Sequence, residues 1–275
     1  VDYAVYKQGT LIVALVSPFF CLLSPISLSY FFSKTQSEPQ RKAYVLQTVF
    51  ALLLISFAGS LAIYIFRAQI GQAYNNPKLI QYMPQFSIIL FMESSVQYYA
   101  YYMVCINKSR ILATTTILFS LLKTLSLLAA IAIGGDILSS FMLFYVLAVA
   151  FKFIFILCYT FWQGKTVKIA FSRIHVRQQL LFSVPVFVMG IINSLNANLD
   201  KNIVAMLYDP AKYAVYVNGA YQIPFIGVLS SSIISVMLPD ITKRYVPGEQ
   251  TILTDIVQEF RGVIRVSYAI LFAIF

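Results

Sequence analysis

Eight apolar stretches follow one another along the chain, and each is about long enough to cross a membrane as a helix. An α-helix rises about 1.5 Å per residue, so about 20 apolar residues cross a hydrocarbon core of about 30 Å. Hydrophobic residues make up 60% of the sequence and charged residues only 11%, which is far more apolar surface than one soluble core can bury. The sequence therefore predicts an all-α polytopic membrane protein. The stretches cover residues 11–32, 44–66, 83–106, 111–133, 138–161, 180–198, 216–239 and 262–275.

Lys and Arg are distributed unevenly between the loops that separate these stretches. Alternate loops form two sets, with eleven basic residues in one set and four in the other. The richer set holds Lys34, Arg41, Lys42, Lys108, Arg110, Lys165, Lys168, Arg173, Arg177, Lys243 and Arg244, and the poorer set holds Arg67, Lys78, Lys201 and Lys212. Cytoplasmic loops accumulate Lys and Arg, so we expect the richer set in the cytoplasm. The first stretch then runs inward, and we expect an earlier helix to precede it.

A short repeat relates the first and seventh stretches. Tyr3-Ala-Val-Tyr6 with Gly9 recurs, at a constant offset, as Tyr213-Ala-Val-Tyr216 with Gly219. An even number of helices separates the two copies, so both copies run in the same direction through the membrane. This arrangement is typical of two bundles related by an axis along the membrane normal. We therefore expect two six-helix bundles, of which this chain is a fragment with about eight transmembrane helices.

Three regions follow from this interpretation. We expect residues 1–162 to form an N-terminal lobe that lacks its first helix, and residues 180–275 to form the start of a truncated C-terminal lobe. Between them, residues 163–179 form a basic cytoplasmic linker. The linker is either an ordinary loop or a surface helix that lies on anionic lipid headgroups.

Several classes of function find little support in the sequence. The net charge of +10 is spread over short loops, which does not indicate nucleic-acid binding. Cys21, Cys105 and Cys158 are isolated in apolar runs, and His175 is the only histidine, so we expect neither a metal site nor a cofactor. We find no nucleophile elbow, no phosphate-cradling glycine loop and no usable pair of carboxylates, so we expect no enzymatic activity.

Three charged residues lie near the middle of apolar stretches. They are Glu93, Lys123 and Lys152, and a charge at that depth costs roughly 3 kcal/mol on insertion scales. Either Glu93 pairs with one lysine and ties the bundle together, or the three line a polar cavity for an anionic substrate. Two lysines against one glutamate leave a positive balance, which suits a diphosphate because Lys acts as a point charge toward phosphate oxygens.

Two further groups of polar residues recur at helical spacing. Glu93, Gln97 and Tyr101 are four residues apart, which predicts a shared helix face beside a cluster of further tyrosines, Tyr98, Tyr99 and Tyr102. These tyrosines form either an aromatic belt at the cytoplasmic interface or a surface that stacks on sugar rings. A second face carries Asn193, Asn196 and Asp200, and Lys201 follows Asp200 directly. This face serves either hydrogen bonding between helices or the wall of a cavity or ion site.

One segment resembles a known family. Residues 198–222 are similar to the start of the second lobe in Wzx-type polysaccharide flippases, which move O-antigen or capsule units. These flippases belong to the multidrug/oligosaccharidyl-lipid/polysaccharide exporter superfamily. The Asp200-Lys201 pair and the segment Tyr216–Tyr221 carry the likeness, and Tyr3–Tyr6 with Gly9 looks like the matching entry to the family's second helix. The chain departs from the family at Asp209-Pro210, where Gly is common.

This resemblance implies two six-helix bundles that work by alternating access in the bacterial cytoplasmic (inner) membrane. It implies an undecaprenyl-diphosphate-linked oligosaccharide as substrate, as in lipopolysaccharide or O-antigen synthesis. It also implies possible coupling to H⁺ or Na⁺, with Glu93 or Asp200 as ion sites, and contact with other polysaccharide-assembly proteins. Asp200 and Lys201 match a family motif, whereas Glu93, Lys123 and Lys152 are predicted from their depth alone.

Two alternatives remain open at the level of the sequence. A cation-coupled multidrug exporter of the same superfamily would favour acidic residues in its cavity, which the two deep lysines oppose. A membrane-embedded polysaccharide polymerase or ligase would need a long external loop with catalytic groups, and no predicted external loop is that long.

Overall fold

The computed structural model describes residues 2–20, 25–164, 173–220, 261–262 and 265, and within these ranges the chain is helical apart from short turns. Val1–Val217 form one compact unit, and Asn218–Phe275 form a second unit, of which only a few residues are described. The fold below is that of the first unit.

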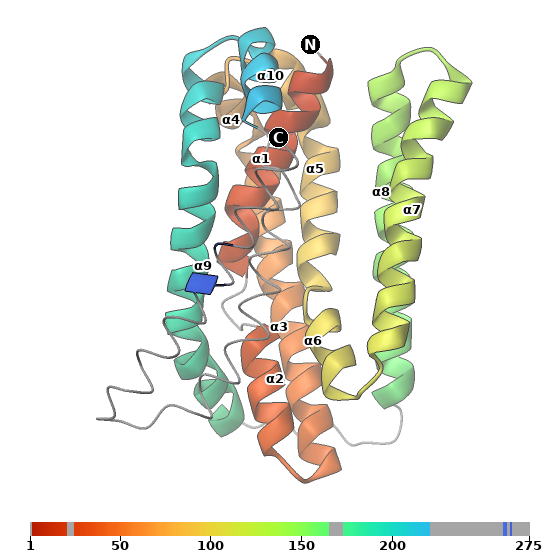
Figure 1. The fold of residues 1–275 in the computed structure, drawn as a ribbon, viewed down its shortest axis with the longest axis vertical. Helices are drawn as coiled ribbons and strands as arrows, with labels where there is room; N and C mark the ends of the chain where they lie inside the picture. The colour runs from red at the N-terminus through yellow and green to blue at the C-terminus, as the bar shows by residue number, and fades with distance from the viewer. Residues whose placement is uncertain (1, 21–24, 165–172, 221–260, 263–264, 266–275) are drawn as a thin grey trace. The chain divides into compact units, whose positions relative to one another are not determined.

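The first half of this unit crosses back and forth three times (Figure 1). Its first crossing consists of three helical pieces in series, and its third consists of two. A short helix, α4, lies between the second and third crossings. The elements are α1 (Asp2–Val16), η1 (Ser17–Phe20), α2 (Pro25–Lys34), α3 (Glu38–Ile65), α4 (Arg67–Ala73), α5 (Pro77–Ser95) and α6 (Tyr98–Cys105).

The second half begins with a hairpin of two long helices and ends in a short helix. We call the end of the unit with the α2–α3 and α6–α7 connections the basic end, and the end with α4 and the α7–α8 and α9–α10 turns the opposite end (Figure 1). Gly134 and Gly135 form the hairpin turn with φ of 73° and 77°, a region that favours glycine. The elements are α7 (Ser109–Ile133), α8 (Ile137–Gly164), α9 (Arg173–Leu207) and α10 (Pro210–Gly219).

Within the described residues, the first six predicted apolar stretches are helical apart from some end residues and a short turn at residues 96–97, and residues 21–24 of the first stretch lie outside the described residues. In the part of the chain that the structure describes, five helical segments are long and apolar enough to cross a membrane, namely 2–34, 38–65, 109–133, 137–163 and 176–207. The predicted stretch 83–106 is instead divided between α5 and α6. Helix α9 extends the predicted stretch 180–198 at both ends. The seventh stretch begins within α10, and its remainder and most of the eighth lie outside the described residues.

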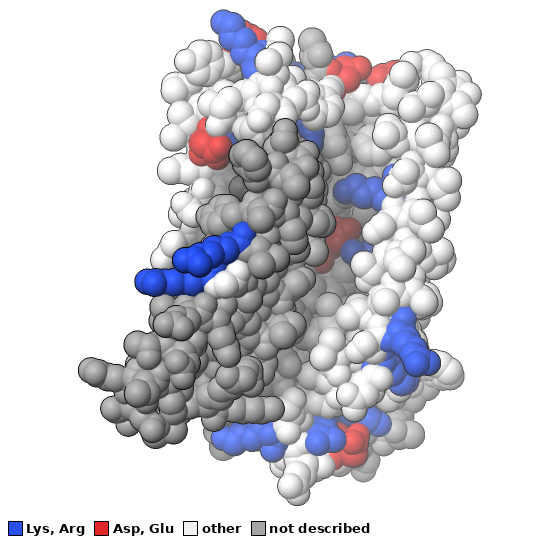
Figure 2. Space-filling model, viewed as in Figure 1, with Lys and Arg blue, Asp and Glu red and all other residues white. Residues whose placement is uncertain are grey.

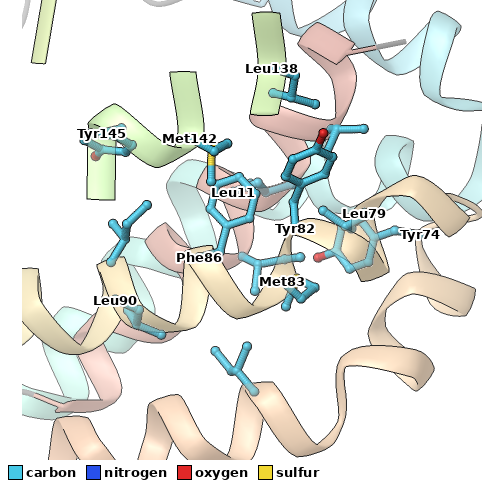
Figure 3. Close-up of a cluster of buried hydrophobic side chains, with 14 of the residues drawn as sticks. Leu11, Tyr74, Leu79, Tyr82, Met83, Phe86, Leu90, Leu138, Met142 and Tyr145 are labelled. Carbon is cyan, nitrogen blue, oxygen red and sulfur yellow. The ribbon is translucent and has the colours of Figure 1, made fainter. Parts of the chain in front are cut away.

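The main core lies where α1, α5 and α8 meet, and Figure 3 shows its buried side chains. Phe86 and Met83 of α5 and Met142 of α8 are almost fully buried. Gly9 lets α1 approach α5 closely, because a Cβ at this position would overlap the ring of Phe86. This packing holds α5 in the centre of the unit, where the candidate sites lie on either side of it.

The tyrosine cluster at the basic end belongs to a second core and does not form an aromatic belt. Tyr98 is fully buried, and its hydroxyl hydrogen-bonds to Thr160 at 2.8 Å. Tyr99 and Tyr102 are also buried, and the Tyr99 hydroxyl lies 3.4 Å from that of Thr115. The belt interpretation is therefore wrong for these three residues, because Tyr98 and Tyr99 face α8 and α7 while the ring of Tyr102 packs on Phe32 of α2.

Hydrogen bonds at the opposite end tie α9 to the α4–α5 turn. The Tyr74 hydroxyl donates to Oδ1 of Asn202, and Asn75 donates to the carbonyl of Met206 at 2.7 Å. Burial raises the pKa of Tyr74 to about 12, so its hydroxyl keeps the proton that it donates. Helix α9, which the sequence assigns to the second lobe, thus packs on the first crossing, formed by α1, η1 and α2, and is bonded to the α4–α5 turn. The lobe boundaries at 162 and 180 stay a prediction.

The Asp209-Pro210 step, where the sequence departs from the resembled family, begins α10. Pro210 is the first helical residue, a position at which its missing N–H carries no cost. Oδ1 of Asp209 accepts the backbone N–H of Lys212 at 3.0 Å, which is the bond of an N-terminal helix cap. This hydrogen bond lowers the pKa of the Asp209 carboxyl.

Candidate functional site

A small polar cavity lies between the α5–α6 pair and the α7–α8 hairpin. Its volume is about 160 Å³, and we call it the cationic cavity. Figure 2 shows blue and red side chains within a hollow beside the hairpin, at the middle of the unit's height. Glu93, Lys123 and Lys152, which the sequence singles out by depth, all line this cavity. The structure therefore brings together three charges that are far apart in the chain.

One lysine of the cavity is neutralised by its glutamate. Nζ of Lys152 donates to Oε2 of Glu93 at 2.6 Å. The side chains are 27% and 35% exposed, so the pair lies at the cavity wall with part of its surface open. An ion pair of this kind lowers the cost of holding either charge between apolar helices.

The other lysine contacts two tyrosines. Nζ of Lys123 lies 4.7 Å from the ring centroid of Tyr145, a cation–π contact, and also interacts with the Tyr6 hydroxyl. Among the described residues Lys123 forms no ion pair. Because Glu93 is already bound to Lys152, the three charges sum to one positive charge, and that charge lies at Lys123.

The helices that line the cavity carry their polar residues in register. On α7, Thr116, Ser120 and Lys123 are four and three residues apart and share one face, and all three line the cavity. On α8, Tyr145 and Lys152 are two turns apart and share a face in the same way. Thr116, Ser120 and Tyr145 were not predicted from the sequence. Their helical spacing from the deep lysines on α7 and α8 is the signal that could have identified them.

A second cavity lies on the other side of the α5–α6 pair. It is lined by residues of η1, α2, α6 and α9, has a volume of about 360 Å³ and holds no charged residue among its described lining. We call it the neutral cavity. Gln97 and Tyr101 line it, together with Phe187 and Gly190 of α9.

The prediction that Glu93, Gln97 and Tyr101 share one face is wrong. Helix α5 ends at Ser95, and α6 begins only at Tyr98. In the turn between them, the N–H of residue 97 bonds to a carbonyl three residues earlier, which is the tighter 3₁₀ pattern. This turn changes the direction in which later side chains point, so Glu93 faces the cationic cavity and the other two face the neutral one.

The predicted face on α9 is separate from both cavities. Asn193, Asn196 and Asp200 are exposed, and none of them lines either cavity. Oδ2 of Asp200 accepts the hydroxyl of Tyr216 at 2.9 Å, and Lys201 donates to the carbonyl one turn before it. Their role in substrate or ion binding stays a prediction. In the described ranges, no three His, Cys, Asp or Glu residues gather in a group that could hold a metal ion.

Comparison with known proteins places the chain in a family. Residues 12–259 match the family described as polysaccharide biosynthesis protein. The chain belongs to this family. No curated protein and no solved structure matches it. The family confirms the resemblance to flippase-type polysaccharide proteins, and together with the apolar helices it identifies a multi-pass membrane protein of polysaccharide biosynthesis.

Proposed function

We propose that this polysaccharide biosynthesis protein is part of a flippase. It carries an undecaprenyl-diphosphate-linked oligosaccharide across the bacterial cytoplasmic membrane by alternating access of two helical lobes, and the basic end faces the cytoplasm. In this proposal it performs no chemical reaction on the lipid.

The observation that carries the proposal is the positive charge at Lys123 in the cationic cavity. A transporter of a lipid diphosphate needs a cationic group in the membrane, because phosphate oxygens lose their water there. Lys123 supplies such a group without a carboxylate partner among the described residues. Thr116 and Ser120 add hydroxyl groups to the same wall.

The arrangement of Glu93 also favours an anionic cargo over a cationic drug. A drug exporter for cations needs an acidic group that is open to the substrate. Glu93, the only carboxylate among the described residues that line the cationic cavity, is bound to Lys152 at 2.6 Å. A cation that entered would have to displace Lys152 and would be repelled by Lys123.

Transport in proteoliposomes tests this proposal. The full-length protein is reconstituted with a fluorescent undecaprenyl-diphosphate sugar, and movement between leaflets is measured for the wild type and a Lys123→Ala, Lys152→Ala variant. An Arg67→Ala, Lys212→Ala variant removes two charges at the opposite end that line neither cavity and serves as the matched control.

We expect the cavity variant to lose transport at least tenfold, while the control keeps it. Each variant is checked for folding by its elution as a single species from a sizing column. Transport by a well-folded cavity variant at the wild-type rate would remove the lysines from the substrate path. If the wild type moves no lipid-linked sugar, the flippase assignment itself fails.

A further inference from the structure

An apolar groove adjoins the cationic cavity. It lies between α1 and the α7–α8 hairpin and has a volume of about 520 Å³, within the range of roughly 300–1,000 Å³ usual for ligand pockets. Its apolar walls are Leu127 of α7 with Ile137, Leu138 and Phe141 of α8. Lys123 lines both the groove and the cavity, so the apolar groove begins where the cationic cavity ends.

The charges along the groove differ between its two ends. Lys123, near the middle of α7, gives one end a positive charge. At the other end Asp2 is bound to Lys78 at 2.6 Å, and Asp136, next to the groove residue Ile137, accepts the hydroxyl of Tyr82 at 3.2 Å. Lys7 also lies near this end, with its Nζ 5.4 Å from the ring centroid of the groove residue Tyr3, so two carboxylates and two lysines leave it without net charge. An anionic headgroup is therefore attracted only to the Lys123 end.

The groove suits a hydrocarbon chain that starts directly at a phosphate. Thr124 is the only hydroxyl beside Lys123 on the groove side of α7, and it donates to the carbonyl of Ser120 at 3.2 Å. Past Lys123 the walls that α7 and α8 provide are otherwise apolar, so the ester groups of an ordinary phospholipid, which lie between phosphate and chains, would lose water there without gaining hydrogen bonds from these two helices. In a polyprenyl diphosphate, hydrocarbon follows the phosphate at once. Tyr6 and Phe141, whose rings lie edge to face at 5.3 Å, provide an apolar surface for it.

We propose that this groove binds the first isoprenoid units of a polyprenyl-diphosphate lipid while Lys123 holds its diphosphate. The inference rests on the proposed function and adds to it a binding site for the lipid chain. Beyond the groove, the rest of the lipid chain continues into the bilayer. The groove thus selects the lipid carrier, whichever sugar is attached to it.

Photo-crosslinking tests this inference on the full-length protein. Leu127→benzoylphenylalanine places a photoreactive group in the groove, and Leu128→benzoylphenylalanine places it on the neighbouring residue, which does not line the groove. Each variant is irradiated in phosphatidylethanolamine–phosphatidylglycerol vesicles that contain radiolabelled undecaprenyl-diphosphate sugar. The yield of labelled protein is then compared, with and without Lys123→Gln.

We expect at least fivefold more labelling from position 127 than from position 128. Unlabelled undecaprenyl diphosphate should compete for it, extra phosphatidylglycerol should not, and Lys123→Gln should lower it severalfold. Equal labelling at both positions, equal competition by phosphatidylglycerol, or crosslinks from position 127 to protein would each overturn the inference. A transport assay on the same vesicles distinguishes the two proposals. Transport without selective labelling would support the flippase function and contradict only the proposed lipid-binding groove.

Discussion

The cationic cavity and the neutral cavity lie on two sides of the same helix pair and differ in charge. The first is lined by α5–α8 and holds three charged side chains, whereas the second is lined by η1, α2, α6 and α9 and holds none among its described lining. They share no lining residue. One turn between α5 and α6 separates them, since it directs Glu93 to one side and Gln97 with Tyr101 to the other. Helical spacing therefore fixes a shared face only while the helix is unbroken.

Residues that the sequence predicts for one substrate site therefore lie in two separate cavities. A headgroup bound at Lys123 cannot at the same time stack on Tyr101, because the α5–α6 pair lies between them. We therefore expect recognition of the lipid diphosphate to depend on the cationic cavity. The predictions below test that division, from the largest effect to the smallest.

Charge reversal at Lys123 should have the largest effect. Lys123→Glu places two carboxylates beside one lysine, which makes the cavity negative and repels a diphosphate. We expect transport of a lipid-linked sugar to fall more than tenfold, whereas Lys123→Arg, which keeps the charge, should retain most of it. Rates are measured in proteoliposomes of equal protein content. Equal rates for the Glu and Arg variants would show that charge at this position does not matter.

The close approach of α1 and α5 should have the next largest effect, on stability. Gly9→Ala forces the ring of Phe86 out of its position in the core and should cost about 1–3 kcal/mol, as overpacking usually does. The repeat supplies the control, because a Cβ at Gly219, the counterpart of Gly9, meets no described atom within 4 Å. Melting in detergent, followed by loss of the monodisperse peak, should show a lower midpoint for Gly9→Ala only. An unchanged midpoint would mean that this contact does not hold α5 in place.

The ion pair between Glu93 and Lys152 should show coupling. Glu93→Gln leaves Lys152 unpaired and should lower stability by about 1–2 kcal/mol, less than for a fully buried pair because both side chains are partly exposed. Adding Lys152→Met removes the orphaned charge and should recover most of the loss. A double-mutant cycle of melting midpoints measures this. Additive losses in the double variant would rule out a stabilising pair.

The smallest effect is expected in the neutral cavity. Tyr101 is 39% exposed and lies across the α5–α6 pair from Lys123. Tyr101→Ala should change transport less than twofold, measured beside Lys123→Glu in the same vesicle preparation. A tenfold loss would instead support the sugar-stacking role that the tyrosine spacing suggests, and would make the neutral cavity part of the path.

The positions of most helices could be predicted from the sequence because a membrane-spanning helix needs a long run of apolar residues. A helix of about 20 apolar residues satisfies its own backbone groups across the bilayer, so α7 and α8 start and end close to the predicted residues, whereas α3 begins earlier than predicted, at Glu38. The extension of α9 to Leu207 was not predicted, because the polar residues Asp200, Lys201 and Asn202 indicate the end of an apolar run. In the structure Asn202 instead accepts the hydroxyl of Tyr74, which a pattern along one segment cannot reveal.

The candidate site could be predicted only in part. Depth alone identified Glu93, Lys123 and Lys152, because a charge in the membrane needs a polar partner or a cavity. Which lysine pairs with Glu93 depends on how α5 and α8 pack, and this is a property of tertiary contacts. The break after Ser95 was also missed, since no Pro or Gly marks it in the sequence.

Binding of the lipid substrate tests the central claim most directly. The dissociation constant of an undecaprenyl-diphosphate sugar is measured for the full-length protein in nanodiscs, with Lys123→Gln and Tyr101→Ala variants side by side. Loss of a charged hydrogen bond costs about 1.5–3 kcal/mol, so affinity should fall roughly tenfold or more for Lys123→Gln and stay within twofold for Tyr101→Ala. Unchanged affinity in Lys123→Gln, with a tenfold loss in Tyr101→Ala, would contradict the claim and place the substrate in the neutral cavity.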